Sequence, residues 1–124
     1  MNYLRYIFSI FFIVLCITNI CYAHVTILQP VGGEVLTGNS NFTIKWDIDE
    51  SVPPNENWDI RFSPDNGLNW KVVTKNLNST VRQFNWKVPN VNTTQGRIEV
   101  IEDRPTGTDD GVRSGPFTIV RLKK

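Results

Sequence analysis

The stretch Phe42-Thr43-Ile44-Lys45-Trp46-Asp47-Ile48 alternates large apolar residues with polar ones. That period of two is typical of a strand with one face on a core and the other in water. Trp58-Asp59-Ile60-Arg61-Phe62 and Phe84-Asn85-Trp86-Lys87-Val88 repeat the pattern. No window keeps the three-to-four spacing of an amphipathic helix. The sequence therefore predicts an all-β protein.

Shorter segments of the same kind lie before, between and after these three. Apolar residues that we expect to face inward are Val25, Ile27, Leu36, Leu68, Trp70, Val72, Ile98, Val100, Phe117 and Ile119. The segments are separated by turns such as Ser63-Pro64-Asp65-Asn66-Gly67, where Pro fixes its own φ and Gly accepts a positive one. About seven short strands in ~100 residues predict an immunoglobulin-like β-sandwich of two sheets.

All four tryptophans, Trp46, Trp58, Trp70 and Trp86, fall on the inward phase of these segments. Large aromatic side chains supply much of the buried area of a small core. We therefore expect all four to pack in the core and not to form a sugar-stacking surface.

The amino terminus has the features of a secretory signal. Arg5 precedes an apolar run over residues 6–17, and Cys21-Tyr22-Ala23 supplies a small-residue cleavage site. A spanning helix needs ~20 apolar residues, so an uncleaved anchor is the weaker alternative. We expect a signal peptide at residues 1–23, cleavage after Ala23, and a secreted protein that is extracellular or held in a cell wall.

Cleavage would leave residues 24–124, which is enough for a single domain. Both cysteines lie in the signal, so the secreted chain would have no disulfide. Removing Arg5 leaves 12 basic residues, 13 minus one, against 12 acidic ones, a balance that argues against nucleic acid as a partner. No apolar tail follows the basic cluster at Arg121, Lys123 and Lys124, so we expect no membrane anchor after cleavage.

Five segments in this order resemble the Kre/Knh-type domain. They are Gln29–Glu34 with Gly38 and Thr43–Trp46, Ile60–Trp70, Phe84–Pro89, Arg97–Val100, and Ser114–Ile119. In that family the domain forms the amino-terminal part of fungal cell-wall β-1,6-glucan assembly proteins and of Ser/Thr-rich, glycolipid-anchored surface proteins. The resemblance spans the whole secreted chain and implies one sandwich domain with a role in wall or surface architecture. This chain lacks the Ser/Thr-rich region and the anchor tail.

Three N-glycosylation sequons begin at Asn41, Asn78 and Asn92. Asn78 and Asn92 fall in predicted loops, which suit a bulky surface glycan, whereas Asn41 opens a predicted strand. All three are candidate glycosylation sites.

Catalytic chemistry has little support in the sequence. The secreted chain has one histidine and no cysteine, so a nucleophile with a histidine base would need His24, its first residue. Acidic residues gather between Glu102 and Asp110, but they lack the regular ligand spacing of a calcium loop, and the glycines among them favour a solvated turn. We therefore expect no enzyme activity, no catalytic residue and no bound cofactor.

His24 nevertheless supports an alternative. After cleavage its free amine and ring Nδ1 could chelate one copper ion, with Asp109 in place of the second histidine that such sites usually have. The main expectation is a secreted, non-enzymatic cell-wall or surface module that binds or organises polysaccharide or surface proteins. The alternative is a copper-binding protein that uses His24.

Overall fold

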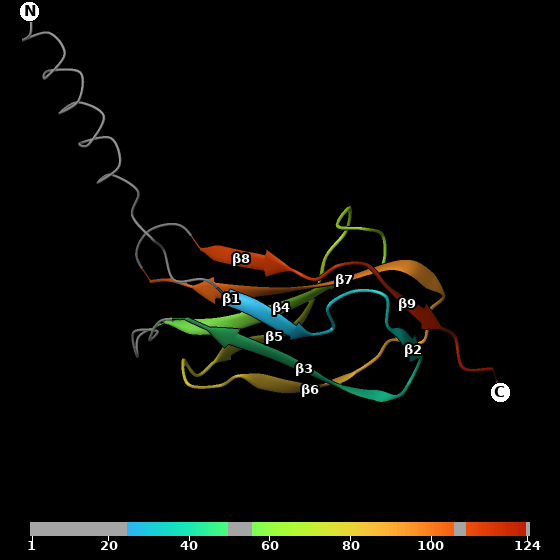
Figure 1. Ribbon diagram of the computed structural model, residues 1–124, viewed down its shortest axis with the longest axis horizontal. Coiled ribbons are helices and arrows are strands. Elements are labelled where there is room, and N and C mark those ends of the chain that lie inside the picture. Colours follow the sequence, from blue (N-terminus) through green and yellow to red (C-terminus); the bar gives the residue numbers. More distant parts are fainter. Residues whose placement is uncertain (1–24, 50–55, 106–108, 124) are drawn as a thin grey trace, which may run out of the picture.

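The computed structural model describes residues 25–49, 56–105 and 109–123. Over these residues the protein is all-β, with nine strands and no helix (Figure 1). Accordingly, this part of the chain holds no helix long and apolar enough to cross a membrane. The predicted signal peptide at residues 1–23 and the candidate ligand His24 lie outside the described residues.

The strands form two sheets. Their bounds are β1 (Val25–Gln29), β2 (Val35–Thr37), β3 (Asn41–Ile48), β4 (Asn57–Ser63), β5 (Lys71–Leu77), β6 (Gln83–Lys87), β7 (Thr93–Asp103), β8 (Asp110–Arg113) and β9 (Phe117–Val120). The smaller sheet has the order β1-β3-β6, and the larger one has the order β2-β9-β7-β4-β5, with β8 also paired to β7. In Figure 1, β3 and β6 run along one side of the molecule and β7, β8 and β9 along the other.

A sandwich-like core separates the sheets. Its aromatic centre joins both, since Phe62 of β4 lies 5.2 Å from Trp86 of β6 and 6.2 Å from Phe117 of β9 between ring centroids. Trp46 and Trp58 meet edge to face at 6.0 Å. The predicted inward phase of β1, β3, β4, β6, β7 and β9 is confirmed, because the buried apolar residues of these strands are the ones that the alternation selected. Because the cross-sheet contacts pair bulky rings, the two layers are joined by apolar packing alone at this point.

The predicted turn after β4 is also confirmed. Asn66 and Gly67 have positive φ values of 61° and 91°. Gly adopts such values without strain, and Asn tolerates them better than most residues do. The Ser63 hydroxyl accepts from the Gly67 N–H at 2.8 Å and donates to Asp65 at 2.8 Å. Hydrogen bonds from the Asn69 side chain and backbone and from Ser63 lower the pKa of Asp65. The loop from β4 to β5 is thus built on its own side chains, and it projects from the body of the molecule (Figure 1).

The expectation that Leu68, Trp70 and Val72 face inward is wrong. β5 begins only at Lys71, so Leu68 and Trp70 belong to the loop; Leu68 is 83% exposed and Val72 is 59% exposed. Asp65 accepts from the Asn69 N–H at 2.8 Å, which prolongs the turn and delays the strand. A local side-chain bond here competes successfully with strand alternation.

The structure has nine strands where about seven were expected. The additional pairing comes from β8, in the segment expected to be a solvated turn. β7 is long enough to pair with β9 through Thr93 and Gly96 and with β8 through Glu99 to Glu102. Glu102, expected in solvent, is only 2% exposed and lies opposite the buried Trp58 in the ladder of β4 with β7. The solvated-turn interpretation is therefore wrong for this residue.

Candidate functional site

A groove opens where the edges of the two sheets lie beside each other. It has a volume of about 450 Å³, and it is lined by Phe62, Lys71, Val72, Val73, Phe84, Asn85, Trp86, Lys87 and Pro89. β5 is the edge strand of the larger sheet and β6 is the edge strand of the smaller one, and residues of both strands line the groove. We call this feature the edge groove. Its floor is apolar and largely aromatic, while its rim is polar.

The backbone of β6 adds unpaired polar groups to this rim. The Trp46 N–H donates to the Arg82 carbonyl at 3.0 Å and the Val88 N–H donates to the Ser40 carbonyl at 2.9 Å. In an antiparallel ladder these directions alternate along the strand. The register of β3 with β6 is unbroken, so the N–H and C=O groups of Asn85 and Lys87 point away from β3, toward the open edge.

Two lysines supply charge to the edge groove. Lys71 stands opposite Phe62 in the ladder of β4 with β5, and opposite residues of an antiparallel pair point to the same face. Phe62 is buried, so Lys71 leaves the strand on the core-facing side, although it is itself exposed. Lys87 ends β6 at the groove's other wall and is also exposed. Among the described residues neither ammonium group has an ion-pair partner.

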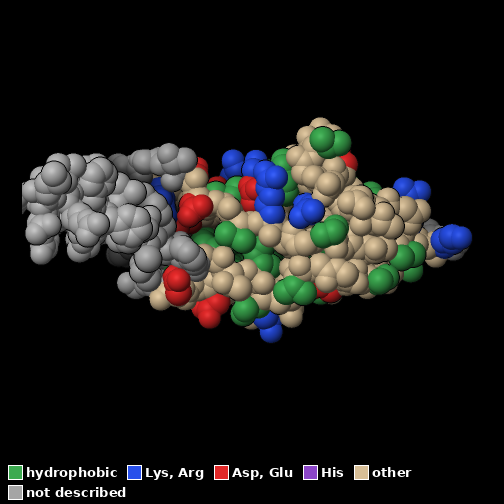
Figure 2. Space-filling model, turned by 45° about the horizontal axis from the view of Figure 1, so that its top comes forward, with side chains coloured by type: hydrophobic (Ala, Val, Ile, Leu, Met, Phe, Trp, Pro, Cys, Tyr) green, Lys and Arg blue, Asp and Glu red, His purple; other side chains and the backbone are tan. Residues whose placement is uncertain are grey.

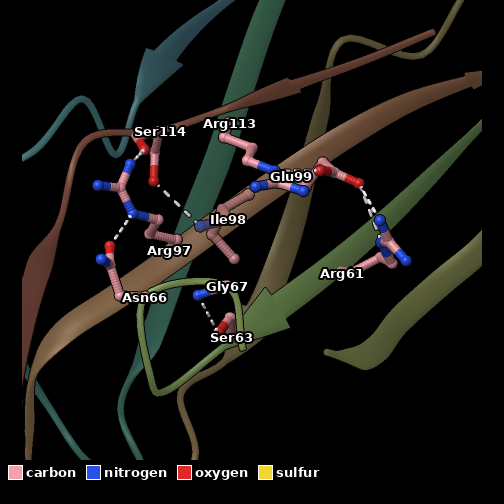
Figure 3. A network of polar contacts seen from close by, with 9 residues as sticks. All are labelled: Arg61, Ser63, Asn66, Gly67, Arg97, Ile98, Glu99, Arg113 and Ser114. Atoms are coloured by element: carbon pink, nitrogen blue, oxygen red, sulfur yellow. Dashed lines mark hydrogen bonds and ion pairs between the residues drawn. The ribbon is translucent and has the colours of Figure 1, made fainter. Parts of the chain in front are cut away.

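The outer face of the larger sheet has a different arrangement, in which charges are compensated. Glu99 of β7 is buried between Arg61 of β4 and Arg113 of β8 (Figure 3). Arg61 donates to Glu99 through Nε at 3.0 Å and also through a second guanidinium nitrogen, and Arg113 Nε donates to the other carboxylate oxygen at 2.6 Å. We call these three residues the arginine clamp. Both oxygens of its carboxylate are therefore occupied.

Trp70 completes this face. The Arg61 and Arg113 guanidinium carbons each lie 5.0 Å from the centroid of its ring, so the indole makes two cation–π contacts. Lys and Arg side chains gather at the base of the projecting loop in Figure 2. In Figure 3 Arg97 reaches Asn66 and the Ser114 carbonyl, at 2.5 and 2.8 Å. These arginines attach the loop to the sheet. Trp70 was predicted in the core, and the clamp is the reason that it packs outside.

A third charged cluster lies where β4 begins. A hydrogen bond to Glu102, burial and the charge of Glu102 raise the pKa of Glu56 from 4.5 to about 7, and Arg104 opposes this rise. Glu56 Oε2 is buried without a hydrogen-bond partner among the described residues. Arg104 contacts Glu102 at 3.3 Å. Protonation of Glu56 relieves its repulsion with Glu102, so Glu56 is a pH-sensitive element of the fold.

The three sequons occupy different settings. Asn78 is exposed, and its Oδ1 accepts from the Thr80 N–H at 3.0 Å and from the Thr80 hydroxyl at 2.9 Å. Asn92 is exposed and its Oδ1 accepts from the Arg121 N–H at 2.8 Å. Asn41 is exposed at the start of β3, opposite Lys87. Each asparagine is therefore accessible to a glycan.

Only one of the two candidate copper ligands lies among the described residues. His24 lies outside them, while Asp109 Oδ1 accepts from the Arg104 N–H at 3.1 Å. Among residues 25–49, 56–105 and 109–123 no group of three or more His, Cys, Asp or Glu side chains could hold a metal ion.

The chain matches no protein-family model, and no curated protein is significantly similar to it. The resemblance to the Kre/Knh-type domain stays a prediction.

Sequence reasoning missed the edge groove. Lys71 and Lys87 appear as ordinary polar residues beside strand segments, and only the strand order shows that they share one opening. The available signal was Lys71 itself, a charged residue on what proves to be the inward phase of β5.

Proposed function

We propose that this protein is a secreted, non-enzymatic, immunoglobulin-like module of the cell wall or cell surface that binds polysaccharide in the edge groove. The observation that carries the proposal is the groove: an aromatic floor with a polar rim, open along two strand edges. Binding sites for small polar ligands commonly combine apolar walls with a few placed polar groups.

The chemistry of a sugar chain suits these surfaces. A pyranose ring has apolar C–H faces, which pack on aromatic and aliphatic side chains such as Phe84 and Val73, and hydroxyl groups at its edge. Those hydroxyls can bond the outward N–H and C=O groups of Asn85 and Lys87, which pair with no other strand of residues 25–49, 56–105 and 109–123.

The direct test is a pull-down with insoluble cell-wall polysaccharides at moderate salt. The purified protein should be retained, and a Phe84→Ala/Asn85→Ala variant should lose most of that retention. Leu28→Ala is the matched control, because Leu28 is 52% exposed on β1, the opposite edge of the same sheet.

Circular dichroism of each variant verifies that the fold is intact. Equal retention of the wild type on unrelated insoluble polymers, or no retention at all, would remove the polysaccharide function in favour of a protein partner. Equal loss in the Leu28→Ala control would place binding away from the groove.

The extracellular part of the proposal has its own test. Protein recovered from the medium of expressing eukaryotic cells should begin at His24 by mass spectrometry, and a glycan should be removable enzymatically from Asn78, whose side chain is exposed. Retention of Met1 on membrane-bound protein would contradict secretion. An unchanged mass in Asn78→Gln would contradict glycosylation at that residue.

A further inference from the structure

We propose that the edge groove selects an anionic polysaccharide, one whose sugar rings carry carboxylate groups. This inference rests on the proposed function and concerns its ligand class. It follows from the charge of the groove, whose lining includes two lysines and no acidic residue.

The two lysines are free to bind a ligand. In the arginine clamp each guanidinium is committed to Glu99, whereas the described residues place no carboxylate within ion-pair distance of Lys71 or Lys87. The whole chain carries a formal net charge of only +1, so the positive charge of Lys71 and Lys87 is concentrated at the edge groove and does not reflect a basic protein. Low-dielectric walls such as Phe62 and Trp86 strengthen the field that such a pair projects into the groove.

The position of Lys71 favours a sugar chain over a peptide strand as the occupant. A charged residue that points inward on an edge strand disfavours the addition of another strand, because the new strand would bury the charge away from water. Lys71 has this orientation on β5, opposite the buried Phe62. A polysaccharide requires no strand register, so its carboxylates can meet the ammonium groups while its rings lie on the apolar floor.

The test compares two forms of one polymer. Polygalacturonate and its fully methyl-esterified form share a backbone and differ in charge, so the ratio of their affinities isolates the electrostatic contribution. Calorimetry should give about tenfold tighter binding of polygalacturonate at low salt, since two partly exposed ion pairs contribute about 0.7 kcal/mol each. In ~1 M salt, where the Debye length is ~3 Å, the ratio should fall toward one.

Variants locate the effect. Lys71→Gln/Lys87→Gln should bring the affinity ratio close to one while the esterified polymer still binds. Lys45→Gln/Lys123→Gln removes the same charge from exposed lysines that do not line the groove, and it should keep the wild-type ratio. Thermal unfolding confirms that both variants are folded.

The outcomes separate the two proposals. Equal affinity for both polymers would overturn the anionic selectivity and leave polysaccharide binding standing. No binding to either polymer or to any cell-wall polysaccharide would overturn both. A ratio that survives in Lys71→Gln/Lys87→Gln would move the selectivity away from the groove. Poly-glutamate that binds as tightly as polygalacturonate, and is lost in the same variant, would show an acidic peptide to be the occupant and overturn the inference.

Discussion

The arginine clamp and the edge groove both carry positive side chains, but among the described residues only in the clamp is the positive charge paired with a carboxylate. In the clamp, Glu99 is buried between Arg61 and Arg113 and both of its oxygens are bonded. In the groove, Lys71 and Lys87 face solvent beside an apolar floor with no acid among the lining residues. A compensated charge stabilises the fold that holds it, whereas an uncompensated one is available to a ligand.

Removing the centre of the clamp should have the largest effect. Glu99→Ala leaves two guanidinium groups stacked on Trp70 without a carboxylate, and we expect the free energy of unfolding to fall by about 2 kcal/mol, less than for a fully buried pair because both arginines are partly exposed. Urea denaturation measures this change. A midpoint equal to that of the wild type would mean that the clamp contributes nothing to stability, and the comparison would fail.

Trp70, which packs against both arginines of the clamp, should have a smaller effect on the free energy of unfolding. Trp70→Ala removes two cation–π contacts, worth ~0.5–1 kcal/mol each at exposed sites, so the free energy of unfolding should fall by about 1–2 kcal/mol. Polysaccharide retention should not change, because Trp70 does not line the edge groove. Trp70→Phe keeps an aromatic face and should recover part of the loss. A selective loss of retention in Trp70→Ala would make the clamp part of the binding surface.

The carboxyl groups of Glu56 and Glu102 lie close together, and their repulsion should make the stability of the protein depend on pH. Because the pKa of Glu56 is raised to about 7 in the folded protein, its stabilising contribution is complete below pH 4.5 and is lost as the pH rises toward 7. The stability of the wild type relative to Glu56→Gln should therefore decrease between about pH 4.5 and about pH 7.5. Urea midpoints of both proteins across this range measure the difference. A difference that does not vary with pH would mean that the pKa of Glu56 is not raised in the folded protein.

The groove lysines should have the smallest effect on stability. Lys71→Gln/Lys87→Gln removes no ion pair between described residues, so the free energy of unfolding should stay within about 0.5 kcal/mol of the wild type. The same urea measurement applies. A loss as large as that of Glu99→Ala would show that these lysines are structural, and the distinction between the two regions would disappear.

The sequence alone was sufficient for the all-β class, for the two packed sheets and for most of the core. Strict alternation around Trp46, Trp58 and Trp86 identified buried faces correctly, because a period of two can bury only one side of a strand. It failed at Trp70, where the local bond from Asn69 to Asp65 delays β5 and two distant arginines supply another environment for the ring. It also missed β8, since glycine and aspartate are poor strand formers and only the length of β7 provides them with a partner.

The candidate site, by contrast, depends on tertiary structure. Residues 62, 71–73, 84–87 and 89 line one groove because β5 and β6 end their sheets on the same side, and strand order is set by the packing of whole sheets. The sequence by itself determined which side chains are apolar enough to form two packed layers. Only the tertiary structure decided where those layers remain open and which lysines stand at the opening with no ion-pair partner in the part of the chain that the structure describes, because ion pairing depends on distances between strands that are far apart in the chain.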